Sequence, residues 1–174
     1  MAITDKEKGV WGLDQVYNKI NQGSIWTYSG SPGGLYVWGR NDGNNRSLGL
    51  NDIGSRSSPT QLPGTTWKEV FIPGYSPSNQ HAIKTDGTLW SWGYNYVGSL
   101  GTHAPGVSAY SSPIQIGSDT TWESGAKNMQ SACAVKTDGT LWSWGINTHG
   151  ALGQNNRTHQ SSPVQIPGTT WSKV

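Results

Sequence analysis

Side chains that could act as acids, bases, nucleophiles or metal ligands are few and widely spaced. The histidines are His81, His103, His149 and His159, and no two of them form a His-x-His or i, i+4 pair. No Gly-x-Ser-x-Gly elbow or phosphate-binding glycine loop occurs. The lone cysteine, Cys133, has no partner for a disulfide or a cysteine metal cluster, and its apolar neighbours predict a buried strand position. We therefore expect no enzyme activity, no metal and no cofactor.

Two aspartates, a residue type that serves in acid–base chemistry and metal binding, are explained here by turns. Asp86-Gly87 and Asp138-Gly139 lie inside identical Lys-Thr-Asp-Gly-Thr-Leu-Trp segments, between short β-rich runs. An Asp-Gly pair in this setting predicts a two-residue type I′ hairpin, which needs positive φ at both central residues. We expect two hairpins, which pair residues 81–85 with 88–92 and residues 131–137 with 140–144.

The elements that carry these turns recur along the chain. A Trp-Gly pair at the end of an apolar run occurs three times, at intervals of 54 and 52 residues, as Trp38-Gly39, Trp92-Gly93 and Trp144-Gly145. Each copy continues with Leu-Gly, Ser-Ser-Pro and Thr-Thr-Trp, and the gaps between these landmarks vary in length. A glycine after a strand tryptophan predicts a bulge or a close backbone approach. The variable gaps predict loops, above all 40–47, 97–110 and 148–160.

Composition excludes several classes of protein. The 24 Gly, 10 Trp and 13% charged residues predict many short strands and turns in a folded chain. A net charge of +2 with scattered Lys and Arg argues against nucleic-acid binding. No apolar stretch approaches the roughly 20 residues that a membrane-spanning helix needs. No nucleic acid and no membrane span are therefore expected.

A repeat of about 52 residues has the length of one propeller blade of four short antiparallel strands. We expect an all-β fold, a partial β-propeller in residues 35–174, with copies at 35–88, 89–140 and an incomplete one at 141–174. An incomplete copy leaves three explanations open. The sequence is a piece of a longer protein, which we favour, or several chains share one ring, or the N-terminal segment supplies the missing strands.

The string Leu-Trp-Ser-Trp-Gly-x-Asn-x-x-Gly-x-Leu-Gly, followed by Ser-Ser-Pro-x-Gln-Ile and Lys-Thr-Asp-Gly, resembles the regulator-of-chromosome-condensation repeat. The resemblance covers residues 35–174 and implies a β-propeller, seven-bladed in typical members. Relatives in that family include a chromatin-bound exchange factor, a β-lactamase inhibitor and phage proteins, so the fold does not specify a function. The near-identical, Trp-rich copies in this chain are most similar to versions in bacteriophage structural proteins.

The segment 1–34 differs in kind from the repeats. Its apolar residues are spaced by three and four positions, which predicts a short amphipathic helix over 6–20, followed by an extended stretch. It resembles N-terminal segments of phage virion proteins, which implies attachment to other virion proteins; a cap on the first blade is the alternative. The expected attachment residues are Trp11, Leu13, Val16, Tyr17 and Ile20.

These observations lead to two hypotheses about function. The first is a non-enzymatic virion structural protein of a bacteriophage, a tail, fibre or decoration component that is oligomeric in the assembly. Its propeller loops would form a host-attachment surface that contacts a host surface molecule, and its location would be the virion. The alternative is a cellular, cytoplasmic protein-binding propeller that resembles an inhibitor or an exchange factor.

Overall fold

The computed structural model describes residues 34–43, 45–71, 79–104, 106–128, 130–172 and 174 of the chain. The predicted helix over 6–20 and its attachment residues lie outside this part. The described residues form ten β-strands and one short 3₁₀ turn, η1. None of the helical structure within these ranges is long and apolar enough to cross a membrane.

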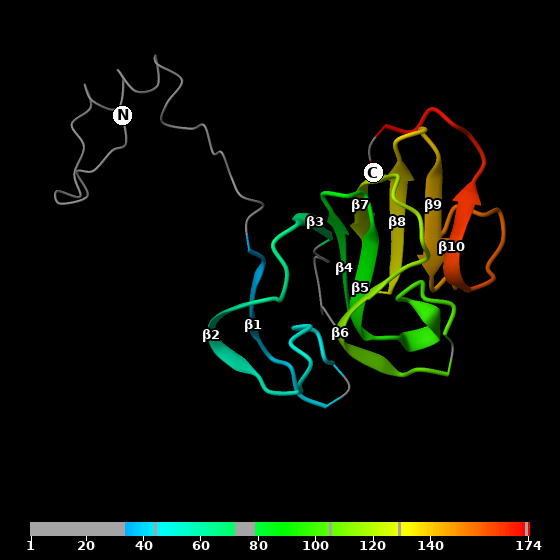
Figure 1. Ribbon diagram of the computed structural model, residues 1–174. Helices are drawn as coiled ribbons and strands as arrows, with labels where there is room; N and C mark the ends of the chain where they lie inside the picture. Colours follow the sequence, from blue (N-terminus) through cyan, green and yellow to red (C-terminus); the bar gives the residue numbers. More distant parts are fainter. Residues whose placement is uncertain (1–33, 44, 72–78, 105, 129, 173) are drawn as a thin grey trace, which may run out of the picture. The chain divides into compact units, whose positions relative to one another are not determined.

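The strands form three antiparallel sheets, as Figure 1 shows. The first sheet has two strands, β1 (Tyr36–Gly39) and β2 (Arg56–Gln61). The second has the order β3 (Trp67–Phe71), β4 (Asn79–Lys84), β5 (Leu89–Tyr94) and β6 (Ala109–Gln115). The third has the order β7 (Trp122–Lys127), β8 (Ser131–Lys136), β9 (Leu141–Gly145) and β10 (Gln160–Ile166). The expected all-β fold with four-stranded blades is confirmed.

Each four-stranded sheet combines parts of two sequence copies. The strands β3 and β4 follow the first Ser-Ser-Pro landmark, whereas β5 and β6 carry the Trp-Gly and Ser-Ser-Pro landmarks of the second copy. The third sheet is assembled in the same way from the second and third copies. Each four-stranded sheet therefore takes two strands from one sequence copy and two from the next. As a result, each Asp-Gly hairpin lies in the middle of a sheet.

Both predicted hairpins are present, as β4–β5 and β8–β9. The prediction of a type I′ turn is wrong, because only the glycine takes positive φ: Gly87 has φ +76° and Gly139 has φ +77°. The Asp86 carboxylate explains the difference. Its Oδ1 accepts hydrogen bonds from the Thr88 amide (3.0 Å) and the Thr88 hydroxyl (2.6 Å), which hold a turn closed by a single left-handed glycine.

The Trp-Gly glycines bend their strands as expected. Gly39, Gly93 and Gly145 have φ values of +107°, +94° and +102°, in the region that side chains disfavour. The ladder register shifts at or beside each of the three. At Gly145 the backbone of a neighbouring turn comes so close that a Cβ would lie 2.3 Å from the Gln130 carbonyl oxygen. Both predicted roles, the bulge and the close approach, are confirmed.

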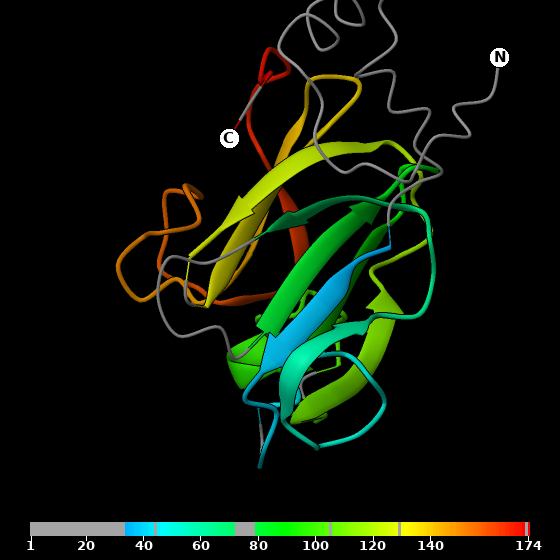
Figure 2. The same cartoon turned by 90° about the vertical axis from the view of Figure 1, so that its left-hand side faces the viewer.

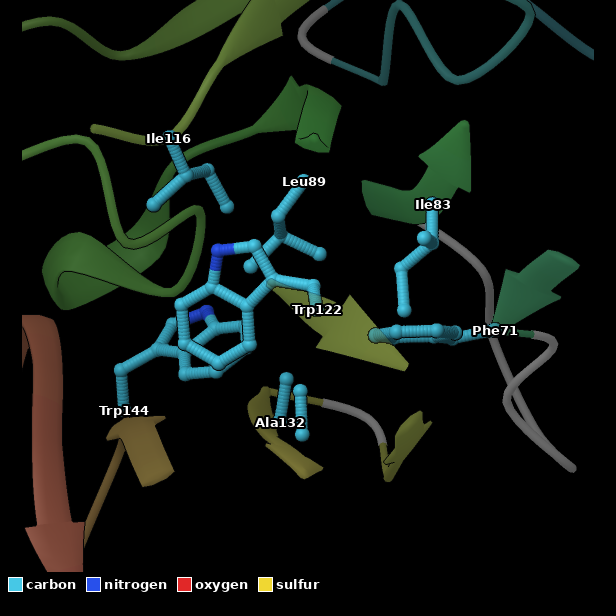
Figure 3. Close-up of a cluster of buried hydrophobic side chains, with 8 residues drawn as sticks. Phe71, Ile83, Leu89, Ile116, Trp122, Ala132 and Trp144 are labelled. Atoms are coloured by element: carbon cyan, nitrogen blue, oxygen red, sulfur yellow. The ribbon is translucent and has the colours of Figure 1, made fainter. Parts of the chain in front are cut away.

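The core lies between the sheets and is rich in tryptophan. Figure 3 shows Phe71, Ile83 and Leu89 of the second sheet facing Trp122, Ala132 and Trp144 of the third. A second cluster joins the first sheet to the second through Leu62, Trp67 and Trp92. The aromatic rings meet edge-on or tilted, as in the pair Trp122–Trp144, with 6.3 Å between centroids and 67° between planes. A sheet of this kind buries its apolar face only against its neighbour.

A lysine lies between two tryptophans within each four-stranded sheet. Lys84 Nζ is 3.7 Å from the ring centroid of Trp90 and 4.9 Å from that of Trp67. The third sheet repeats this arrangement with Lys136, whose Nζ lies 4.1 Å and 4.7 Å from its two tryptophan rings. The Lys of the repeated Lys-Thr-Asp-Gly segment therefore has a structural role, because a cation over an aromatic face is attracted by the ring quadrupole.

Candidate functional site

The candidate site is a groove of about 550 Å³ between the second and third sheets. Three segments line it: η1 (Tyr96–Gly98), the turn between β7 and β8, and the loop after β9. Figure 1 shows η1 beside the lower ends of β9 and β10, which brings the loops of two successive copies together. The lining residues are Tyr96, Val97, Asn128, Gln130, Ser131, Ile146, Thr148, His149, Ala151 and His159.

Two of the three loops predicted as contact surfaces, 97–110 and 148–160, meet in this groove. No described residue of the third loop, 40–47, lines it. At the position of Val97 in the second copy, the third copy has His149 and the first has Asn45. The groove is therefore built where the copies differ, on strands that are nearly the same in each copy.

A buried asparagine holds each of these loops. Asn95 and Asn147 are 5% and 0% exposed, and both follow a Trp-Gly pair by two residues. The side-chain nitrogen of Asn147 donates to the backbone carbonyl oxygens of Asn156 (3.0 Å) and Thr158 (3.1 Å). Its side-chain oxygen accepts a hydrogen bond from the backbone N–H of Leu152 (3.0 Å). Asn95 makes the corresponding bonds in the preceding loop. These residues were not among the predicted site residues, although their constant position after Trp-Gly is a signal that would have found them.

The groove contains fixed hydrogen-bonding groups. His159 Nδ1 accepts a hydrogen bond from the backbone N–H of Asn147 at 2.9 Å, so the neutral ring carries its proton on Nε2. Asn128 Oδ1 accepts from the amides of Gln130 (3.1 Å) and Ser131 (2.9 Å), which orients the turn between β7 and β8. None of the ten lining residues is Asp, Glu, Lys or Arg. The groove therefore presents uncharged hydrogen-bond donors and acceptors to a ligand.

The opposite wall is aromatic and conformationally strained. Tyr96 is 47% exposed and stacks on Tyr94 at a centroid distance of 6.0 Å with 16° between the planes. Val97 beside it has φ +51° and ψ 36°, which is a left-handed conformation that a β-branched residue rarely adopts. Such strain costs on the order of 1–3 kcal/mol and is concentrated at sites of ligand contact and switching.

A different polar cluster lies buried between the second and third sheets. His81 Nε2 accepts a hydrogen bond from the Trp144 indole at 3.1 Å, and the His81 ring is 1% exposed. Lys127 Nζ donates to the Asn79 carbonyl oxygen at 2.6 Å and also to the Asn79 side-chain oxygen. Burial lowers the pKa of Lys127 to about 7. The pKa of His81 lies well below its usual value, chiefly because of burial and secondly because of the Lys127 charge.

The other predicted residues have structural positions. Asp86 and Asp138 close the hairpins at the ends of β4 and β8 that are remote from the groove. Trp92 and Trp144 are 1% and 0% exposed, whereas Trp38 is 61% exposed. Cys133 lies on β8 as predicted but is only half-buried there, and burial raises the pKa of its thiol. Within the described ranges, no group of three or more His, Cys, Asp or Glu side chains could hold a metal ion.

Known proteins resemble this chain in sequence and in fold. The profile of the regulator of chromosome condensation (RCC1) repeat matches residues 138–174. The RCC1 domain-containing protein RUG3, mitochondrial, of Arabidopsis thaliana is 30% identical over 158 residues, which are 82% of this chain and 33% of RUG3. The ultraviolet-B receptor UVR8 of the same plant is 28% identical over 134 residues, 77% of this chain and 30% of the receptor.

The structure of Prp20p from Saccharomyces cerevisiae superposes with a TM-score of 0.66 at 19% identity, over 78% of this chain and 34% of that protein. At this identity the likeness concerns the fold alone. The chain spans about a third of the length of these relatives. The repeated landmarks, the four-stranded sheets and these similarities agree that the chain is built of RCC1-type tandem repeats and that its sheets resemble part of an RCC1 β-propeller.

Proposed function

We propose that this chain is a non-enzymatic, protein-binding part of an RCC1-repeat propeller and that the groove between its second and third sheets receives an uncharged segment of the partner. The observation that carries the proposal is the meeting of two variable loops, each held by a buried asparagine, around one hollow. Surface loops on a rigid scaffold are where recognition is usually located.

The chemistry of the groove supports a protein partner. An exposed tyrosine supplies a rigid contact surface at low entropic cost, and tyrosine is enriched among the residues that dominate interface energies. The fixed His159 and the amide side chains of the β7–β8 turn supply donors and acceptors without charge. A partner loop with backbone amides and polar side chains would match these groups.

The similar proteins also support a protein-binding function. Prp20p is described as binding Gsp1p and histones, and UVR8 is named a receptor. These proteins come from plants and yeast, so the comparisons favour the cellular alternative over a phage virion protein.

Site-specific crosslinking tests the proposal. A photoreactive phenylalanine analogue replaces Thr148, which lines the groove and is exposed, and the crosslinked partner is identified and purified. We expect Tyr96→Ala and His149→Ala to weaken its binding by about tenfold to a hundredfold, as truncation of interface anchors does. Thr137→Ala, at the opposite end of β8, is the matched control and should leave the affinity unchanged. Equal affinity of the groove variants and the control would overturn the proposal.

The sequence resemblance to phage repeat proteins supports a second candidate, a virion structural protein attached through residues 1–34. The supporting observation is the identity of Lys-Thr-Asp-Gly-Thr-Leu-Trp-Ser-Trp-Gly between two copies. Mass spectrometry of purified virus particles from the same source tests it. A fixed stoichiometry of this chain in the particles would favour the virion role, and its absence from them would exclude that role.

A further inference from the structure

Two polar side chains in the groove, His159 and Asn128, have only hydrogen-bond donors left for a ligand. His159 Nδ1 accepts a hydrogen bond from the backbone N–H of Asn147 at 2.9 Å. The neutral ring therefore carries its proton on Nε2, and the charged ring has a proton on both nitrogens. His159 is exposed and lines the groove. In either state it offers a ligand a donor and no acceptor.

Asn128 reaches the same state through the turn that it orients. Its Oδ1 accepts hydrogen bonds from the backbone N–H of Gln130 (3.1 Å) and from the backbone N–H (2.9 Å) and hydroxyl (2.8 Å) of Ser131. A carbonyl oxygen has two lone pairs, so these bonds occupy it fully. The residue is exposed, and its side-chain nitrogen carries two donors. Asn128 thus offers a ligand hydrogen-bond donors.

Among the described residues that line the groove, none offers only acceptors. An ionised carboxylate is the side chain that accepts without donating, and neither Asp nor Glu belongs to the lining. The other polar side chains can donate as well as accept, and they are Tyr96, Gln130, Ser131, Thr148 and His149. The lining side chains therefore favour a ligand that brings more acceptors than donors.

Tyr96 adds a flat apolar surface to this lining. Its ring is 47% exposed and is held by stacking on Tyr94, with centroids 6.0 Å apart and 16° between the planes. Val97, Ile146 and Ala151 extend the apolar part of the lining. A rigid aromatic ring of this kind favours a ligand with an apolar group that packs on its face.

Three common kinds of ligand fit this lining poorly. An anion brings acceptors, but no Lys or Arg among the lining residues would balance its charge. A sugar brings a hydroxyl donor with almost every acceptor. An ordinary peptide backbone brings one N–H for each C=O, and an N–H that is buried against donors stays unpaired, which weakens binding.

Proline combines the properties that the lining favours. It has a backbone C=O but no N–H, and its ring is apolar and uncharged. Proline-rich segments form the polyproline II helix, which has no internal hydrogen bonds, so its carbonyl oxygens are free to accept. Such helices bind to grooves that are lined by aromatic side chains.

The groove also has the size and the access that a short extended segment needs. Its volume of about 550 Å³ lies within the range of roughly 300–1,000 Å³ that is typical of ligand sites. Thr148, His149 and His159 are exposed, and Figure 2 shows the loop after β9, in orange, projecting away from the sheets. A segment of another protein can therefore reach these side chains from solvent.

We propose that the groove binds a proline-rich segment of the partner in the polyproline II conformation, with a proline ring on Tyr96 and backbone carbonyl oxygens at His159 and Asn128. This inference rests on the proposed function, because it names the kind of segment that the protein partner supplies.

Fluorescence anisotropy with a labelled oligoproline peptide tests the ligand class on the full chain. We expect saturable binding of this peptide and no binding of a glycine–serine peptide of equal length. Asn128→Asp keeps an acceptor for the backbone N–H groups of Gln130 and Ser131 but loses both donors, so it should bind the peptide at least tenfold more weakly. Asn155→Asp changes the charge equally at an exposed position outside the lining, and this control should bind like the unmodified chain.

Three results would overturn the proposal. The first is no binding of oligoproline to the unmodified chain, and the second is equal affinity of Asn128→Asp and Asn155→Asp. The third is binding of a neutral maltooligosaccharide in place of the peptide. Tyr96→Ala gives an independent check, because it removes the aromatic ring without touching the β7–β8 turn. It should also weaken peptide binding at least tenfold.

The partner captured by crosslinking at Thr148 separates this proposal from the proposed function. Displacement of that partner by oligoproline would support both. If Tyr96→Ala weakens the binding of the partner but oligoproline does not displace it, the protein-binding function stands and the proline-rich segment is wrong. If Tyr96→Ala leaves the affinity for the partner unchanged, the proposed function itself fails.

Discussion

Gly101 and Trp144 form a steric pair across two sheets: a Cβ on the glycine would stand 2.8 Å from Cδ1 and Nε1 of the indole. Such a distance lies well inside van der Waals contact, so no side chain fits between these residues. The same pair occurs at Gly49 and Trp92. This relationship explains why Leu-Gly and Trp-Gly recur together in the sequence, although they belong to different sheets.

The pair predicts a difference between two glycine substitutions. Gly101→Ala and Gly153→Ala place alanine in the same left-handed backbone, at a shared cost of roughly 1–2 kcal/mol. Only Gly101→Ala also forces the buried Trp144 to move, which costs about 1–3 kcal/mol more. Urea denaturation of both variants measures the difference in their free energies of unfolding. Equal free energies of unfolding would contradict the steric pair.

The cation–π arrangement predicts a second effect on stability. Lys84→Met keeps the apolar stem but removes the charge between Trp67 and Trp90, and we expect a loss of about 0.5–2 kcal/mol. Lys68→Met is the control, because Lys68 forms an exposed pair with Glu123 at 3.1 Å that is worth about 0–1 kcal/mol. The free energy of unfolding of each variant, measured at low ionic strength, decides between these values. A larger loss in the control would refute the structural role of Lys84.

The buried Lys127 predicts a pH dependence. The unfolded chain holds the lysine proton up to its usual pKa of 10.5, whereas the folded protein releases it above about 7. Between these values the unfolded state binds more protons, so stability rises as the pH increases from 7 to 10. His81 adds a change of the same sign at lower pH. Its pKa is depressed by burial in the folded state, so stability falls as the pH drops below 6.5.

Lys127→Met separates the two contributions. The rise in the free energy of unfolding between pH 7 and 10 should flatten in this variant. The decrease in the free energy of unfolding below pH 6.5 should remain, because His81 is still buried. Denaturant melts at a series of pH values measure both. An unchanged slope between pH 7 and 10 would show that Lys127 keeps its proton in the folded state.

The loop around the groove predicts a local effect. Asn147→Ala leaves the buried Leu152 amide without a partner, which costs about 1–3 kcal/mol, and it also removes the donor to the carbonyl oxygens of two exposed loop residues. The substitution should accelerate hydrogen exchange in residues 148–160 more than in β8 and β9. Asn147→Asp should behave in the same way, because a carboxylate cannot donate to carbonyl oxygens. Thr148→Ala, at an exposed position, should leave the exchange unchanged.

Features that depend on neighbouring residues could be predicted from the sequence. The Asp-Gly hairpins, the bends at Trp-Gly and the loops between landmarks follow from turn chemistry and repeat spacing, and the structure confirms them. The turn type was wrong because the Asp86 carboxylate binds Thr88. Propensity rules for the two central residues do not include such a side-chain contact.

The order of residues along the chain suffices to predict a tandem of short antiparallel strands, because strand pairing across a tight turn is a local property of the chain. The folded structure was needed to show which copies share a sheet, how Gly101 makes room for Trp144, and that the loops of Tyr96 and His149 meet in one groove. The physical reason is that these contacts join residues far apart in the chain. Their positions depend on how whole sheets pack, which no local pattern encodes.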